Sequence, residues 1–419
     1  MYTKETAKKA GMHIVILFRW VVFSVVIGGI VGLVGTLFGH AMEVATEFRS
    51  EHDFVLLLLP VFGLIITAIY QKGGLQKNKG TNLILEAISS DEEVPARVAP
   101  VIFISTVLTH LGGGSAGREG AALQLGGSMG TFLGKFFKVD DNDKKVAVMC
   151  GMSAAFAALF GTPVTAAIFP LEVVSVGIMH YSALVPCVLC AMIASEIAVS
   201  FGVHPESFPV TKVPALGFLS VGKLIVLAVL CGVLSILFCY VLHTGEKLFK
   251  EKIANAYLRA VVGGVLIILL TWIVGTRDYN GAGMSVIEKC VMEGEVFWGA
   301  FLLKLLFTAI TLGSGFRGGE IVPAFFVGAT FGCLAGHFLH FSPMLAAACG
   351  MVGVFCGVTN CPISSVFMGL ELFGTAGMQY YLLMVAVSYA MSGYSGLYGS
   401  QKIVYSKFKA EYINKRTGH

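Results

Sequence analysis

The chain has 419 residues, of which 56% are hydrophobic and only 13% are charged, and its formal net charge at pH 7 is +4. A soluble domain of this length would expose far more charge, so the composition excludes a soluble globular protein and indicates an integral membrane protein. The small net charge gives no sign of nucleic-acid binding.

The N-terminal region predicts a cytoplasmic start followed by a membrane span. Three lysines precede the first apolar segment: Lys4, Lys8 and Lys9. No small-residue cleavage site of a signal peptide follows, and positive residues favour the cytoplasmic side, so residues 1–12 are expected in the cytoplasm. The uncharged residues 21–39 approach the roughly 20 residues that a spanning helix needs. The acidic loop at residues 50–53 is expected outside, and the basic loops at 71–80, 135–145 and 246–259 are expected inside.

A charged pair interrupts a long apolar stretch in the first half. In residues 98–134, Arg118 and Glu119 are the only Lys, Arg, Asp or Glu residues. A carboxylate at membrane depth is costly, so it usually faces a pathway and functions there. Clustered glycines surround the pair, in residues 112–117 and at Gly120. Glu119 is therefore the main candidate for a functional carboxylate, and the structural alternative is a carboxylate at a helix start that pairs with Arg118.

The cysteines and histidines favour packing over chemistry. The ten cysteines are scattered through apolar segments, and Cys187-x-x-Cys190 has no nearby ligand partner, so the pair is interpreted as packing. No His-Glu-x-x-His motif is present, and His110, His180 and His337 each stand alone in apolar context. No metal, no cofactor and no enzymatic activity are expected; the alternative class is a membrane-embedded hydrolase.

The sequence contains an internal repeat. At an offset of 199 residues, several positions coincide: Cys150-Gly151-Met152 with Cys349-Gly350-Met351, Pro163 with Pro362, Arg118 with Arg317, and Glu172 with Glu371. The first repeat covers about residues 14–205 and the second about 214–392. Repeated halves are typical of transporters, whose substrate site lies near the membrane midplane between them. The symmetry of the two glutamates favours helix termination or a dimer interface over transport.

The second half predicts further spans and several short helices. Residues 224–245 and 260–276 are long enough to cross a membrane. Residues 321–370 carry no Lys, Arg, Asp or Glu but are interrupted by Pro323, Pro343 and Pro362. This run must therefore form more than one helix.

Each half has a glycine-rich segment that leads into an apolar helix: GSAGREGAALQLGGSMG and GSGFRGGEIVPAFFVGATFG. Non-helical backbone at membrane depth persists only where protein or water satisfies its polar groups. A helix that begins there directs free N–H groups and a positive dipole end into the interior. Such helix starts would attract an anion and still release it, so the pattern favours anion transport over cation transport.

Four motifs together resemble the CLC family of anion transporters and channels over nearly the whole chain. The segment Gly117–Gly120 resembles the gating-glutamate motif, and Gly318-Gly319-Glu320-Ile321-Val322-Pro323 resembles the helix start of the second half. Lys79-Gly80-Thr81-Asn82-Leu83 falls where the family has its first anion-binding helix start. The segment 394–398 is similar to the region of the central tyrosine, with Tyr398 favoured over Tyr394.

The resemblance implies an all-α polytopic membrane protein with a CLC-type fold of two inverted-topology repeats and many tilted and broken helices. It implies one membrane domain over residues 1–419, with a tyrosine-bearing segment and cytoplasmic tail at 393–419 and no regulatory C-terminal domain. It also implies a homodimer in which each subunit has its own pathway. The anion would be held by the backbone N–H groups of Glu320 and Ile321, near Thr81 and Tyr398. Supporting positions are Gly117, Arg118, Gly120, Gly318, Gly319, Pro323 and Asn82.

Departures from the common family pattern indicate the ion and the coupling. The serine that binds chloride in many members is absent at the helix start of Thr81, and the inward-facing glutamate of chloride/proton exchangers aligns with Val173. With Glu320, these features resemble the bacterial fluoride/proton antiporters, although that branch often has methionine where this chain has Thr81.

The expected function is therefore fluoride export in exchange for protons across a bacterial inner membrane, with both chain ends cytoplasmic. Glu119 would compete with the anion when charged and carry a proton when neutral, and Glu320 is a second candidate for an ion or proton role. The alternatives are a chloride/proton antiporter and a passive, voltage-gated-type chloride channel.

Overall fold

The computed structural model of the chain describes residues 2–76, 79–90, 92–211 and 213–417, and the side chains of residues 2–13 lie outside this description. The N-terminal lysines that predict a cytoplasmic start are among these side chains. Within the described residues the first half of the chain contains eight α-helices: α1 (Tyr2–Glu51), α2 (Leu59–Lys72), α3 (Thr81–Ser89), α4 (Val98–Leu111), α5 (Glu119–Phe136), α6 (Asp141–Phe160), α7 (Pro163–Val173) and α8 (Leu184–Ser200). The second half contains α9 (Phe218–Lys252), α10 (Ala256–Val274), α11 (Met284–Met292), α12 (Ala300–Gly313), α13 (Ile321–Phe338), α14 (Pro343–Thr359), α15 (Pro362–Phe373) and α16 (Met378–Met391). Three short 3₁₀ helices connect them: η1 (Asp53–Leu58), η2 (Tyr181–Ala183) and η3 (Thr375–Gly377).

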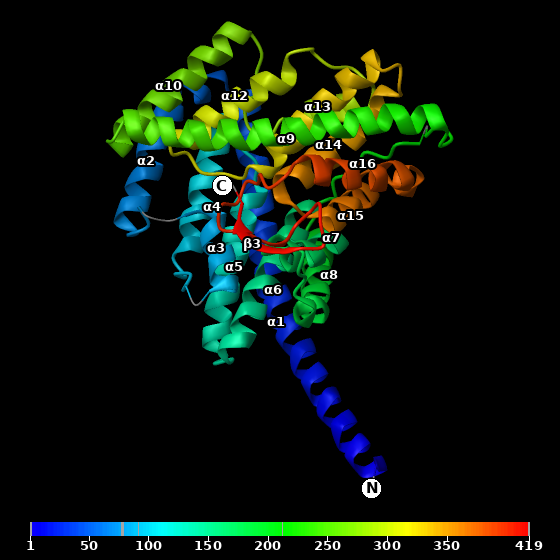
Figure 1. Ribbon diagram of the computed structural model, residues 1–419. Helices are drawn as coiled ribbons and strands as arrows, with labels where there is room; N and C mark the ends of the chain where they lie inside the picture. Colours follow the sequence, from blue (N-terminus) through cyan, green and yellow to red (C-terminus); the bar gives the residue numbers. More distant parts are fainter. Residues whose placement is uncertain (1, 77–78, 91, 212, 418–419) are drawn as a thin grey trace.

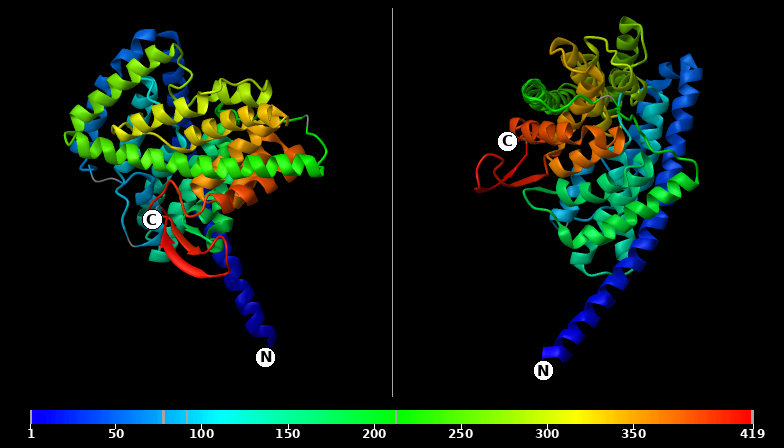
Figure 2. Two further views of the ribbon diagram at one scale, coloured as in Figure 1. Left: turned by 45° about the horizontal axis from the view of Figure 1, so that its top comes forward. Right: turned by 90° about the vertical axis from the view of Figure 1, so that its right-hand side faces the viewer.

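The predicted spans and the predicted interruption are confirmed. In the described part of the chain, six helices are long and apolar enough to cross a membrane, and they include α1, α9 and α10. The run at 321–370 forms three helices, α13, α14 and α15, because Pro343 and Pro362 each take the first position of a new helix, where proline costs no hydrogen bond. The N-terminal part of α1 extends away from the other helices, whereas α9 crosses the body of the molecule (Figures 1 and 2).

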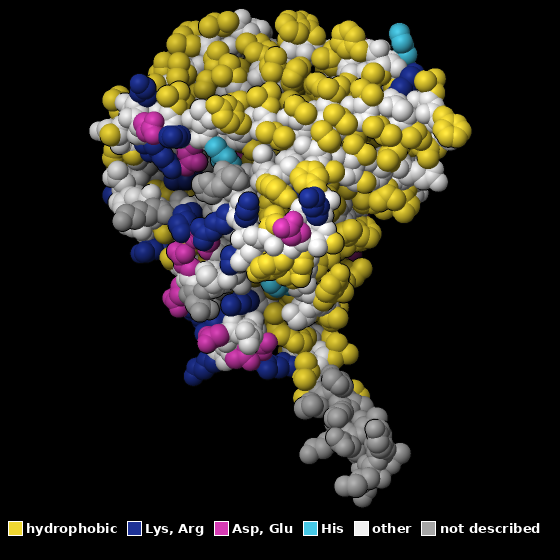
Figure 3. Space-filling view, in the orientation of Figure 1, with side chains coloured by type: hydrophobic (Ala, Val, Ile, Leu, Met, Phe, Trp, Pro, Cys, Tyr) yellow, Lys and Arg dark blue, Asp and Glu magenta, His cyan; other side chains and the backbone are white. Residues whose placement is uncertain are grey.

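The surface is that of a protein surrounded by lipid. Large apolar side chains are exposed on the outer helices, for example Phe218, Trp272 and Ile273. Figure 3 shows hydrophobic side chains over most of the visible face, with the charged side chains gathered to its left and lower parts. Contact of these apolar side chains with lipid chains costs little free energy, whereas their contact with water would be unfavourable.

The two repeats match in space with a changing offset. Helices α5 and α13 both have 18 residues and begin at Glu119 and Ile321, which are 202 positions apart. Helices α7 and α15 begin at Pro163 and Pro362, which are 199 positions apart. The offset changes because α6 has 20 residues and α14 only 17. The predicted equivalence of Arg118 and Arg317 is therefore wrong, since at an offset of 202 Arg118 corresponds to Glu320.

Close backbone packing recurs in both repeats. A β-carbon on Gly126 of α5 would collide with the carbonyl oxygen of Gly151 in α6. In the second repeat, a β-carbon on Gly328 of α13 would collide in the same way with the carbonyl oxygen of Gly350 in α14. Small residues let membrane helices approach until their backbones touch, so each repeat contains one tightly joined helix pair.

Two glutamates connect the repeats through reciprocal helix capping. The carboxylate of Glu172, at the end of α7, accepts hydrogen bonds from Ile363 N at 2.9 Å and from Ser364 N at 2.8 Å, at the start of α15. The carboxylate of Glu371, near the end of α15, accepts from Val164 N at 2.8 Å and from Thr165 N at 2.9 Å, at the start of α7. A carboxylate satisfies the free N–H groups of a helix start and complements its dipole.

A small sheet near the C-terminus was not predicted. It joins β1 (Ser175–Val176), β2 (Lys402–Tyr405) and β3 (Tyr412–Arg416), with β1 parallel to β2 and β2 antiparallel to β3. The hairpin lies over the body of the molecule near the labels of α5 and α6 (Figure 1). The segment expected to be a cytoplasmic tail therefore forms a hairpin that is joined to the membrane domain through the pairing of β2 with β1.

Candidate ion pathway

The two glycine-rich segments meet in the middle of the molecule. Gly117 and Gly319 form an isolated antiparallel bridge, in which the N–H of each donates to the carbonyl of the other at 2.7 Å. A β-carbon on Gly319 would lie 2.5 Å from Gly120 N and 3.1 Å from Glu119 N. Only glycine permits this approach, and it brings the starts of α5 and α13 together.

Glu119 projects from the start of α5 toward the start of α13. The residue is completely buried, and its Oε2 accepts a hydrogen bond from Arg118 N at 3.1 Å. The backbone N–H groups of Glu119 itself and of Val322 also face the carboxylate. Its Oε1 has no hydrogen-bond partner within the described part of the chain, and Arg118 Nε is 3.9 Å away. The carboxylate thus takes the place at a helix start where an anion would bind.

Arg118 forms a long ion pair with Glu119, but it makes its hydrogen bond to a different acid. Its Nη2 donates to Glu206 Oε1 at 2.9 Å, and its guanidinium lies 5.9 Å from the ring centre of Phe160. Together with Glu119, these residues line a cavity of about 780 Å³, called here the Glu119 cavity.

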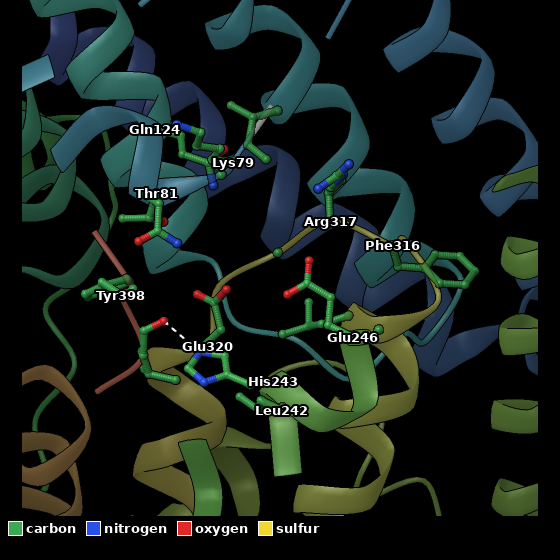
Figure 4. A pocket seen from close by; sticks show the side chains of 18 of the residues that line it. Lys79, Thr81, Gln124, Leu242, His243, Glu246, Phe316, Arg317, Glu320 and Tyr398 are labelled. Carbon is green, nitrogen blue, oxygen red and sulfur yellow. Dashed lines mark hydrogen bonds between the residues drawn. The ribbon is translucent and has the colours of Figure 1, made fainter. Parts of the chain in front are cut away.

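Glu320 opens onto a second cavity, of about 610 Å³, called here the Glu320 cavity. Its Oε2 is buried without a hydrogen-bond partner among the described residues. This oxygen lies 3.1 Å from the position that a β-carbon on Gly120 would take, and Thr81 Oγ1 lies 3.5 Å from the same position. Figure 4 shows Glu320 between Tyr398 and Thr81 on one side and Glu246 and Arg317 on the other.

The Glu320 cavity contains an unused donor. The phenol oxygen of Tyr398 is buried and makes no hydrogen bond to any part of the chain that the structure describes. Among the described residues, the Thr81 hydroxyl makes one hydrogen bond, a long one of 3.4 Å to Gly120 O. A buried hydroxyl without a partner is rare, so this place suits a ligand that accepts hydrogen bonds.

The structure separates Tyr398 from Tyr394. Tyr398 lines the Glu320 cavity, whereas the hydroxyl of Tyr394 bonds Ser406 Oγ at 2.8 Å and its ring contacts Phe408 in the C-terminal hairpin. Of the two tyrosines left open by the motif, Tyr398 is the one beside Thr81 and Glu320.

Some of the remaining predicted residues line the Glu320 cavity, and others are buried beside it in α13. Asn82 and Gly318 line the Glu320 cavity, and Ile321 and Pro323 are buried in the first turn of α13. Asn82 has a fixed contact, because its Oδ1 accepts from Ser400 N at 3.0 Å and from Ser400 Oγ at 2.8 Å. It therefore connects the start of α3 to the loop that carries Tyr398.

Two residues near the Tyr398 loop were missed in the sequence. Gln401 is fully buried, and its Nε2 donates to the carbonyls of Val173 and Thr359, both at 2.8 Å. The hydroxyl of Thr417 donates to the carbonyl of Tyr398 at 2.5 Å. Val173 is itself completely buried, so the position that aligns with the inward-facing glutamate of exchangers is closed off by packing.

Most cations of the Glu320 cavity have partners. Lys79 Nζ bonds Glu86 Oε2 at 2.5 Å, and this hydrogen bond raises the pKa of Lys79. Lys250 pairs with Glu246, also at 2.5 Å, and Arg317 stacks over the ring of Tyr70 at 4.1 Å. The described residues contain no group of three or more His, Cys, Asp or Glu that could hold a metal ion.

Comparison with known proteins gives consistent results over most of the chain. A family model described as "Voltage gated chloride channel" matches residues 62–393. The chain is 34% identical over 396 residues to a "Chloride/fluoride channel protein" of Pseudomonas syringae pv. tomato, covering 93% of this chain and 87% of that protein. It is 26% identical to the "H(+)/Cl(-) exchange transporter ClcA" of Vibrio cholerae, covering 92% of this chain and 88% of that protein.

Solved structures share the fold. A CLC-type fluoride/proton antiporter matches with a TM-score of 0.88 and 32% identity, over 92% of this chain and 98% of that chain. A slow cyanobacterial Cl⁻/H⁺ antiporter matches with a TM-score of 0.76 at 19% identity, over 89% of this chain and 94% of that chain.

Proposed function

The chain belongs to the voltage gated chloride channel (CLC) family, and we propose that it exports fluoride from the cell in exchange for protons. The observation that carries this proposal is the pair of buried carboxylates at Glu119 and Glu320. Each has an oxygen without a hydrogen-bond partner among the described residues, and each lines its own cavity beside the Gly117–Gly319 bridge.

Anion binding would use the donors around the two helix starts. The backbone N–H groups of Glu320 and Ile321, with the hydroxyls of Thr81 and Tyr398, form the proposed site. The free hydroxyl of Tyr398 supports this assignment, since an anion would supply its missing acceptor. Fluoride is a strong hydrogen-bond acceptor, so replacing its water requires such donors in close reach.

Glu119 is the proposed gate and proton carrier. In the structure its carboxylate lies against the N–H group of Val322, in a place that would suit the anion. Carboxylate and anion therefore compete for the start of α13. After accepting a proton, Glu119 is neutral and can leave this place, so that one residue couples the two movements.

Glu320 is the proposed ion or proton group on the other side of the bridge. Val173 is buried and its carbonyl is bonded to Gln401, so this route offers no carboxylate for proton entry. Glu320 offers one, with its free Oε2 near Thr81. We assign a direct role in coupling to Glu320 on this basis.

The sidedness follows from the loops that line each cavity. Gln76 and Lys79, between α2 and α3, and Lys250, in the last turn of α9, line the Glu320 cavity, which is proposed to face the cytoplasm. Glu47 and Ser50 line the Glu119 cavity, which is proposed to face outward. We further propose a homodimer in a bacterial inner membrane, with one domain over residues 1–419 and both chain ends cytoplasmic.

Fluoride is preferred to chloride because the fluoride-linked relatives are nearer in sequence. The chloride/fluoride channel protein and the fluoride/proton antiporter share 34% and 32% identity with this chain, against 26% and 19% for the chloride exchangers.

The test is ion flux from proteoliposomes loaded with fluoride or with chloride, with external pH recorded together with the anion. Fluoride efflux with proton uptake by the vesicles, lost in Glu119→Gln, is the expected result. Chloride efflux with proton uptake would replace the proposal with a chloride/proton antiporter. Rapid chloride efflux without proton movement would replace it with a passive channel.

A further inference from the structure

The Glu119 cavity contains a half-buried cationic side chain that the proposed mechanism does not use. Arg49 lies in the last turn of α1 and lines this cavity. Its Nη1 is buried and has no hydrogen-bond partner anywhere in the described residues.

The backbone around Arg49 is shaped to hold the side chain. A β-carbon on Gly281 would lie 2.8 Å from Arg49 Nη1, and one on Gly113 would lie 3.6 Å from Arg49 Cδ. Both glycines have positive φ, of 61° and 83°. Gly281 N also donates to Gly114 O at 3.1 Å, so the backbone that contacts Arg49 is hydrogen-bonded to the segment that leads to Glu119.

The other cations around this cavity are engaged. Arg118 pairs with Glu206, and Arg277 pairs with Asp53 at 2.8 Å. Lys304 is buried and does not line the cavity, and it donates to the carbonyls of Tyr279 and Gly281. Five acids line the cavity, namely Glu43, Glu47, Glu119, Glu206 and Asp278, and none of them forms an ion pair with Arg49 in the described structure. Arg49 is therefore the arginine of this cavity that has no ion-pair partner within the described structure.

His110 supplies an acceptor in the same cavity. Its Nδ1 lies 3.0 Å from Thr106 O, and since a carbonyl oxygen can only accept, Nδ1 carries the hydrogen. In the neutral ring Nε2 is then a bare acceptor, and it has no partner among the described residues. Such a nitrogen cannot contact an anion directly, but it can accept a hydrogen bond from a water molecule that the anion retains.

We propose that Arg49 forms an outer anion station, at which the exported anion is held with part of its hydration shell after it passes Glu119. The guanidinium of Arg49 binds the small monovalent anion, and a retained water donates to His110. This inference rests on the proposed function, since it requires that an anion leaves through the Glu119 cavity. It adds a second binding place that is separate from the helix starts.

The test uses membrane vesicles of both orientations from cells that produce the full chain. Right-side-out vesicles are loaded with fluoride, and efflux is measured against rising fluoride in the bath. In Arg49→Gln the bath concentration that halves efflux should rise by about three- to tenfold, as expected for loss of a partly solvated charge. Arg49→Lys, which retains the charge, should stay within about twofold of the original. In inside-out vesicles the dependence on bath fluoride should be the same for all three proteins.

The matched control is Arg277→Gln, because Arg277 lines the same cavity but is already paired with Asp53. The proposal would be overturned if the bath fluoride concentration that halves efflux were unchanged in Arg49→Gln. It would also be overturned if that concentration rose equally in Arg277→Gln. If Arg49→Gln does not reach the membrane, the proposal is tested on the unaltered protein by a measurement of salt dependence. Raising an impermeant salt should weaken bath-side inhibition in right-side-out vesicles, and an unchanged value would overturn the proposal. Absence of fluoride flux in the unaltered protein would instead reject the proposed function.

Discussion

Glu119 and Glu320 are each placed against the helix start that carries the other. The carboxylate of Glu119, at the start of α5, faces the N–H group of Val322 in α13. The carboxylate of Glu320, at the start of α13, lies beside Gly120 in α5. The crossing is possible because the Gly117–Gly319 bridge joins the two segments by backbone alone. The two acids can therefore act on one anion from opposite sides.

Glu119→Gln should uncouple protons from fluoride. The amide has nearly the same shape but cannot carry a proton, so proton uptake during fluoride efflux should fall by about tenfold or more. The measurement is simultaneous recording of fluoride and pH in proteoliposomes. Glu288→Gln, an exposed substitution on α11, serves as the control and should leave both fluxes unchanged. Retained proton uptake in Glu119→Gln would assign the carrier to another group.

Tyr398→Phe should weaken anion binding without loss of folding. The hydroxyl makes no hydrogen bond to the described chain, so its removal leaves no protein group unpaired. Fluoride affinity, measured by calorimetry on purified protein, should fall by about tenfold, the size expected for one hydrogen bond to a charged group. Tyr394→Phe is the comparison, because it removes only the contact with Ser406 and should retain fluoride affinity. Equal affinity in Tyr398→Phe and the original would remove the tyrosine from the site.

Gly319→Ala should destabilise the protein. The added methyl group would lie 2.5 Å from Gly120 N, and the backbone bridge cannot give way without separating α5 from α13. The expected cost is about 1–3 kcal/mol or more, typical of an overpacked interior. Gly222→Ala, in α9, meets no atom within 4 Å and should fold normally. Monodispersity on size-exclusion chromatography and thermal unfolding in detergent give the readout, and equal behaviour of the two variants would contradict the tight bridge.

Glu371→Gln should lower stability more than transport. The carboxylate accepts from two N–H groups and from the hydroxyl of Thr165, but it does not line either of the two cavities. Hydrogen bonds to a charged group contribute roughly 1.5–3 kcal/mol, so the melting temperature should fall clearly. The turnover of the protein that remains folded should stay close to the original. Loss of turnover at unchanged stability would instead place Glu371 in the transport cycle.

Lys407 should make stability depend on alkaline pH. Its ammonium lies at the ends of α14 and α16, bonded to Asn360 Oδ1, Ser392 Oγ and Tyr389 O, and burial lowers the pKa of Lys407 from 10.5 to about 8. Between these two values the unfolded chain binds a proton that the folded protein does not, so the free energy of unfolding rises with pH across this window.

The comparison for Lys407 is the variant Lys407→Met, because methionine has no ionisable group at this position. The melting temperature of the original, relative to Lys407→Met, should increase from pH 7 to pH 10, by an amount equivalent to about 1–3 kcal/mol at most. A difference that is constant with pH would show that Lys407 keeps its ordinary pKa, and a difference that decreases with pH would show that folding raises it; either result contradicts the prediction.

Local chemistry in the sequence was enough to identify some features. A lone carboxylate beside clustered glycines singled out Glu119, and prolines in an uncharged run predicted more than one helix where α13, α14 and α15 occur. These signals are local, so they can be read without knowing which segments meet.

Other features depend on contacts between distant segments. Gln401 bonds the carbonyl of Val173, 228 residues earlier, and Arg49 is seated against Gly281. Neither residue lies in a recognisable pattern. The sheet was also missed, because β1 has two residues, β2 four and β3 five, which is too short for a clear alternation of apolar and polar side chains. The repeat offset shifted because α14 is shorter than α6, which a fixed alignment offset cannot represent.

Reciprocal capping also sets an order of events during synthesis. The N–H group of Thr165 at the start of α7 finds its carboxylate partner 206 residues later, at Glu371. When α8 has been synthesised, Glu371 does not yet exist, so the start of α7 lacks its carboxylate partner. Translation of α15 must deliver Glu371 before α7 is complete, and α15 in turn needs Glu172 from the first half. Each half thus supplies the carboxylate that completes a helix start in the other half. A nascent chain arrested before α15 should therefore be a substrate for membrane quality-control proteases.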